Sequence, residues 1–129
     1  MDAEAGARLL LRTDALFELA LGLSLLTGGS TGLNDALDLP PPASGPLTTA
    51  FGGALLPVAA VLWRESERPD RRRLQVLAAS NALTGTLLAG WLVRRRGQTG
   101  VAGVMTVAAA ATGLVALAVA QARIAPRLR

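Results

Sequence analysis

Four long apolar segments, separated by short polar stretches, dominate the pattern of this chain. The segments lie at about 9–27, 47–63, 74–93 and 100–122. The hydrocarbon core of a bilayer is about 30 Å thick, so a helix needs roughly 20 apolar residues to cross it. The last three segments contain no charged side chain, whereas the first contains Arg12, Asp14 and Glu18. The pattern predicts an all-α fold: one transmembrane domain over 1–129, folded as a four-helix bundle.

The longest polar connection, 28–46, predicts the end of the first long helix and then a short helix. Gly28 and Gly29 are typical of a helix end. Leu33 and Leu37 are four residues apart with polar residues between them, which favours a short amphipathic piece at the membrane interface. The run Pro40–Pro42 then predicts an extended stretch before the second segment, and Pro57 inside that segment predicts a kink.

The arginines predict the orientation of the four segments. Four spans place ten arginines on the side of both termini and of the 64–73 connection. The other side has three, Arg94–Arg96, which do not fit the pattern. Cytoplasmic loops are enriched in basic residues, so both termini are predicted to be cytoplasmic. Because the bias toward Arg, Ala, Gly and Leu is typical of a GC-rich bacterial gene, we expect a multi-pass protein of the bacterial inner membrane.

The composition excludes several kinds of chemical site. The chain has no cysteine and no histidine, which excludes disulfides, the usual zinc sites and His-ligated haem. With no histidine and no lysine, a Ser–His or Ser–Lys hydrolase is excluded as well. The pI is near 11.5, but the arginines flank apolar segments, so we expect no nucleic-acid partner. We therefore expect a protein that is not an enzyme, with no cofactor and no metal.

The acidic residues of the first segment are the main candidate site. Asp14 and Glu18 are four residues apart and share one helix face. Acidic groups in hydrocarbon usually face a bundle interior or a water-filled cavity. Glu18 lies at a depth similar to that of Asn81 on the third segment and of the break at Pro57, and Thr84 adds a polar group to the third segment. Asp14, Glu18, Asn81 and Thr84 therefore predict a buried polar layer. Glu18 is expected to be the buried acid, with Asp14 nearer the interface. The layer is either a ligand or proton site, or a structural hydrogen bond from Glu18 to Asn81 or to a threonine.

The triplet Arg71, Arg72 and Arg73 is the second candidate site. It lies at the predicted cytoplasmic start of the third segment, where arginines attract anionic lipid headgroups. The alternative is that these arginines only set the topology and extend toward the interface.

Three stretches resemble a known group: 12–22 in the first segment, Leu37–Pro40 in the outer loop and Ala50–Gly53 in the second segment. In these the chain resembles small four-span bacterial integral membrane proteins of unknown function and, loosely, the DoxX-like group. The resemblance implies a four-helix bundle. Some members of that group are membrane components linked to redox systems.

The leading functional prediction is a non-enzymatic membrane protein that binds a lipid-like small molecule or a membrane partner subunit. The alternative is a small transporter or proton-coupled carrier that uses Glu18. Four helices rarely enclose a solute path alone, so the alternative requires a homo-oligomer. Membrane lipids are expected partners under both hypotheses.

Overall fold

The computed structural model describes residues 2–39 and 46–128, and these are almost entirely helical. No strand is present in the described part of the chain, which confirms the all-α prediction. The elements, in chain order, are α1 (Ala3–Thr31), α2 (Leu33–Ala36), α3 (Pro46–Glu65), α4 (Arg71–Arg95), the 3₁₀ turn η1 (Arg96–Gln98), α5 (Val101–Ile124) and the 3₁₀ turn η2 (Ala125–Arg127). The predicted extended stretch at Pro40–Pro42 lies outside the described residues.

Helix α1 is longer than predicted at its C-terminal end. It begins after Asp2, whose Oδ1 accepts a hydrogen bond from the Ala5 amide over 2.6 Å. It continues past Gly28 and ends at Gly32, which has the left-handed φ of 71°. A Cβ at Gly28 would lie 2.8 Å from Asn34 Oδ1. Glycine at position 28 therefore allows the short predicted helix, α2, to fold back onto α1, and Gly32 ends the helix instead.

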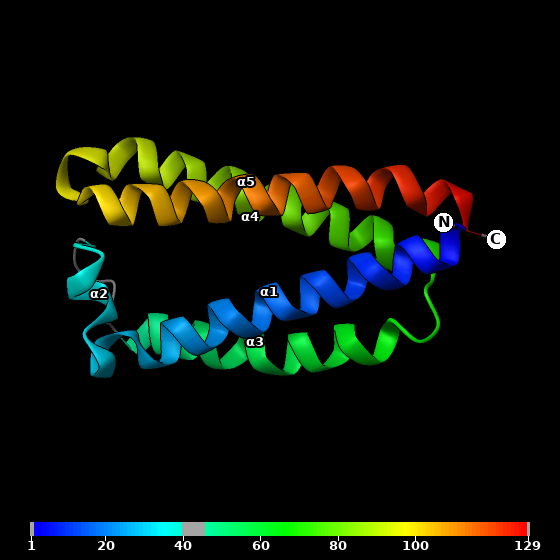
Figure 1. The fold of residues 1–129 in the computed structure, drawn as a ribbon, viewed down its shortest axis with the longest axis horizontal. Coiled ribbons are helices and arrows are strands. Elements are labelled where there is room, and N and C mark those ends of the chain that lie inside the picture. The colour runs from blue at the N-terminus through cyan, green and yellow to red at the C-terminus, as the bar shows by residue number, and fades with distance from the viewer. Residues whose placement is uncertain (1, 40–45, 129) are drawn as a thin grey trace.

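The long helices pack as two antiparallel hairpins. Helix α1 contacts α3 along much of its length, and α4 contacts α5 in the same way. The main helix-to-helix contact between the hairpins is α1 with α5. Figure 1 shows the hairpins close together at the end that holds both chain termini and the α3–α4 connection, and apart at the α2 end. The end that holds the termini is called the terminal end below.

A buried apolar cluster at the terminal end joins the two hairpins. Its members come from α1, α3, α4 and the C-terminal turn: Ala7, Leu11, Ala15, Leu62, Leu74, Ala125 and Leu128. Leu11 and Leu74 are almost fully buried. Pro57 lies inside α3, which remains helical on both sides of it.

Much of the apolar surface outside that cluster is exposed. The accessible surface is 8110 Å², whereas a compact soluble monomer of 13.2 kDa would expose about 6,400 Å². Large side chains on the outer faces of α4 and α5 are more than half exposed, among them Leu83, Leu87, Val93 and Met105. A surface of this kind is covered by lipid or by a partner.

Among the described residues, two helices are long and apolar enough to cross a membrane by length and composition: α4 with η1, and α5 with η2. The core helix of a soluble protein can pass the same test, but it would be mostly buried. Here 17% and 22% of the two apolar windows are buried. This difference favours a membrane environment for the second hairpin.

Candidate functional site

Three polar side chains from three different helices meet inside the structure. Asn81 Nδ2 on α4 donates to Asp14 Oδ2 on α1 over 2.9 Å, and Gln121 Nε2 on α5 donates to the same oxygen over 2.8 Å. Asn81 Nδ2 also donates to Gln121 Oε1 over 3.1 Å. We call these three residues the carboxyl–amide cluster. All three are buried, so their hydrogen bonds form where water does not compete.

Helical periodicity brings these polar groups to the interior. On α1, Asp14 shares the buried face of Ala7 and Leu11; on α5, Gln121 shares that of Leu114 and Leu117. Asn81 lies between Ala78 and Gly85 among the buried positions of α4. Each polar residue therefore replaces one apolar residue in a core stripe, and the three helices meet at that level.

Glu18 does not occupy the place that the sequence predicted for it. It lies one turn beyond Asp14 and is half-buried, while Asp14 is fully buried. The predicted hydrogen bond between Glu18 and Asn81 is wrong, because Asn81 binds Asp14 instead. Asp14 Oδ1 and Glu18 Oε2 are both buried without a hydrogen-bond partner in the described part of the structure. Leaving such acceptors unpaired is costly in an apolar surrounding.

Thr84, the remaining residue of the predicted polar layer, does not join the cluster. Thr84 is half-buried on α4, and it makes no hydrogen bond with the cluster among the residues that the structure describes. Gln121 was not predicted, although it completes the cluster. The available signal was a lone glutamine in an apolar segment, four residues after Leu117 and two before Arg123. A polar residue so close to a charged segment end resembles an ordinary interface residue.

The chemistry of the cluster is limited. Within the described ranges, no group of three or more His, Cys, Asp or Glu side chains could hold a metal ion. Asp14 shares its Oδ2 between two amide donors, which fixes α1 against α4 and α5. The geometry favours the structural interpretation for Asp14 and Asn81, and it leaves Glu18 as the acidic group without a structural role in the cluster.

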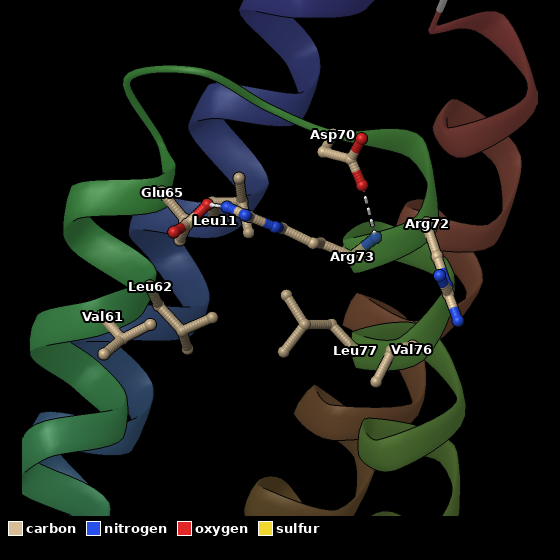
Figure 2. A pocket seen from close by; sticks show the side chains of 9 residues that line it. All are labelled: Leu11, Val61, Leu62, Glu65, Asp70, Arg72, Arg73, Val76 and Leu77. Carbon is tan, nitrogen blue, oxygen red and sulfur yellow. Dashed lines mark hydrogen bonds and ion pairs between the residues drawn. The ribbon is translucent and has the colours of Figure 1, made fainter.

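A second feature lies at the terminal end, between α3 and α4. It is a pocket of about 450 Å³, within the range of small-ligand pockets. Five apolar side chains form its walls: Leu11, Val61, Leu62, Val76 and Leu77. Figure 2 shows the α3 side chains facing those of α4 across the pocket, below the connection between the two helices.

Charged groups surround the apolar walls at the connection: Glu65, Asp70, Arg72 and Arg73. Arg73 forms an ion pair with Glu65, which joins α4 to the end of α3 (Figure 2). Asp70 Oδ1 accepts a hydrogen bond from the Arg73 amide over 3.0 Å and caps α4. Two members of the predicted arginine triplet, Arg72 and Arg73, thus line the pocket. Arg71 is not among its described lining residues.

No protein-family model, curated protein or solved structure matches this chain. The resemblance to the DoxX-like group therefore stays a prediction.

Proposed function

We propose that this chain is a non-enzymatic, four-span protein of the bacterial inner membrane that binds a lipid-like amphiphile between α3 and α4. The observation that carries the proposal is the pocket, because its walls are apolar and its charged groups gather at one end. An amphiphile has the same division, with a hydrocarbon chain and a polar head. In this proposal both termini and the α3–α4 connection face the cytoplasm.

The dimensions of the fold support four spans. Helices α1 and α3 have 29 and 20 residues, and at about 1.5 Å per residue each reaches across a hydrocarbon core of about 30 Å. Asp14 does not prevent insertion of α1, since it accepts hydrogen bonds from side-chain amides of the second hairpin. Both termini lie at the end of the α3–α4 connection in Figure 1, as an even number of passes requires.

The pocket is accessible from the side. Val61 on α3 is 57% exposed and Val76 on α4 is 63% exposed, although both line the pocket. A hydrocarbon chain could enter laterally between the two helices from the surrounding lipid. The polar head would then remain level with the connection, where the charged residues are.

Single-cysteine labelling tests the topology, because the chain has no cysteine of its own. Arg68→Cys lies in the α3–α4 connection, and Gln98→Cys lies at the opposite end in η1; both positions are exposed. In intact cells, a membrane-impermeant maleimide should label Gln98→Cys, and should label Arg68→Cys only after permeabilisation. Equal labelling of both sites in intact cells would exclude four spans.

A crosslinking experiment tests the pocket. A neutral photoreactive monoacylglycerol in proteoliposomes should crosslink to peptides containing Val61 or Val76. Leu77→Trp fills the pocket and should lower the yield. Leu83→Trp is the matched control, because Leu83 is on the same helix, is 62% exposed and lies outside the lining. Equal loss in both variants, or no loss in either, would contradict binding at this pocket.

The two buried carboxyl oxygens without partners favour a second candidate, a proton-coupled carrier that uses Glu18. Such a carrier would need a second copy of the chain to complete a solute path. Proteoliposomes loaded with a pH-sensitive dye test it: wild type should move protons, and Glu18→Gln should not. Equal dye signals from wild type, Glu18→Gln and empty vesicles would exclude this candidate.

A further inference from the structure

We propose that the pocket between α3 and α4 selects an amphiphile with one hydrocarbon chain and an anionic oxygen headgroup, and that Arg72 holds this headgroup. This inference depends on the proposed function, since it specifies the ligand class of the same pocket. The predicted arginine triplet thus acts through one of its members.

The four charged residues that line the pocket have formal charges that cancel. Glu65 and Arg73 neutralise each other in an ion pair. Asp70 caps the N-terminus of α4 through the Arg73 amide, so its carboxylate is already engaged by the helix. Arg72 has no ion pair or hydrogen bond with a side chain in the described part of the chain. Among the charged residues that line the pocket, Arg72 is therefore the one whose side chain the described structure leaves without a protein partner.

Other nearby arginines are less suited to the headgroup. Arg12 Nε donates to Ser66 Oγ over 3.3 Å, and its guanidinium lies 5.3 Å from the centroid of the Trp63 ring. Arg12 is thus engaged where α3 ends. Arg71 does not line the pocket. Arg72 is the lining arginine without a protein partner, and Figure 2 draws its guanidinium beside α4 on the side away from α3, so it would bind an oxyanion at the outer rim of the pocket.

The volume and walls of the pocket also limit the hydrocarbon part of the ligand. Its walls are five aliphatic side chains over a volume of about 450 Å³, which has room for one chain. The exposed valines at its side, Val61 and Val76, give lateral access from lipid. A membrane amphiphile fits this combination better than a free anion does, because a free anion would leave the apolar walls without contacts.

The test is a comparison of two single-chain probes with the same acyl group, measured by native mass spectrometry of the full chain in a neutral detergent. One is the anionic lysophosphatidylglycerol and the other is the zwitterionic lysophosphatidylcholine. Wild type should bind the anionic probe about fivefold more tightly than the zwitterionic one. This is the effect expected of one basic residue near an anionic headgroup. In Arg72→Gln the ratio of the two affinities should fall to about one. In Arg71→Gln, the control from the same helical turn, the wild-type ratio should remain.

Inorganic phosphate distinguishes a lipid from a free anion. At millimolar concentration, phosphate should not displace the anionic lipid. Full displacement would overturn the proposal that the ligand is an amphiphile, and would show a simple anion site instead. Equal binding of both probes to wild type, or the same change in Arg71→Gln and Arg72→Gln, would also overturn the inference while the proposed function stands. If neither probe binds, or if Leu77→Trp has no effect on either, the proposed function fails with it.

Discussion

Asn81 Nδ2 donates a hydrogen bond to Asp14 Oδ2 over 2.9 Å and joins α4 to α1, two helices whose bonded residues are 67 positions apart. This bond, with the one that Gln121 donates to the same oxygen, links the two hairpins. Together with the apolar cluster at the terminal end, the buried hydrogen bonds of Asp14 connect the two hairpins.

Replacement of Asn81 by leucine should therefore loosen the two hairpins. The substitution removes one donor from a buried carboxylate oxygen, and the expected loss is about 1–3 kcal/mol in the free energy of unfolding. Thermal unfolding in detergent measures it. Ser80→Ala is the control, because Ser80 is the exposed neighbour on the same helix. An unchanged melting temperature in Asn81→Leu would show that the bond does not stabilise the fold.

The two amide donors to Asp14 should be energetically coupled. Asn81 and Gln121 donate to the same oxygen, and Asn81 also donates to Gln121 Oε1. Removing either amide weakens what the other contributes, so the losses in Asn81→Ala and Gln121→Ala should differ from additivity by about 0.5 kcal/mol or more. A double-mutant cycle on unfolding in detergent measures this coupling. Strict additivity would mean that the three side chains do not act as one cluster.

The sequence was sufficient for the helices but not for the rotation of α1 about its axis. Runs of about 20 apolar residues predict helices directly. The depth match between the first and third segments paired Asn81 with Glu18, whereas Asn81 binds Asp14. Which acid it faces depends on how α1 packs on α3, and this is set by contacts distant in sequence. The same reason explains why the pocket was not predicted, since residues from three helices form it.

Glu18 should be dispensable for folding. Its Oε2 is buried without a partner in the described structure, so an apolar side chain removes an unsatisfied acceptor. Glu18→Leu and Glu18→Gln should be as stable as wild type, or more stable by up to about 1–3 kcal/mol. Thermal unfolding in detergent checks this, with Asp14→Leu as the destabilised comparison. A clear loss of stability in Glu18→Leu would place Glu18 in the structural cluster after all.

The hairpin of α1 and α3 should depend on two glycines where the helices cross. A Cβ at Gly52 would lie 2.8 Å from Leu25 Cβ and 2.9 Å from the Gly22 carbonyl oxygen. Backbone and Cβ atoms cannot move aside as a flexible side-chain end can, so the helices would have to separate. Close helix packing of this kind is how small residues stabilise membrane helix pairs. The crossing is therefore expected to tolerate no larger residue at position 52.

Gly52→Ala should accordingly destabilise the protein by about 1–3 kcal/mol through overpacking. Gly90→Ala is the matched control: Gly90 is inside α4 and a Cβ there would meet nothing within 4 Å. Since alanine favours helix over glycine by about 0.5–1 kcal/mol, this control should be slightly more stable than wild type. Unfolding in detergent should show changes in the free energy of unfolding that are opposite in sign for the two variants. The same sign in both would mean that α1 and α3 do not approach each other as closely as this crossing requires.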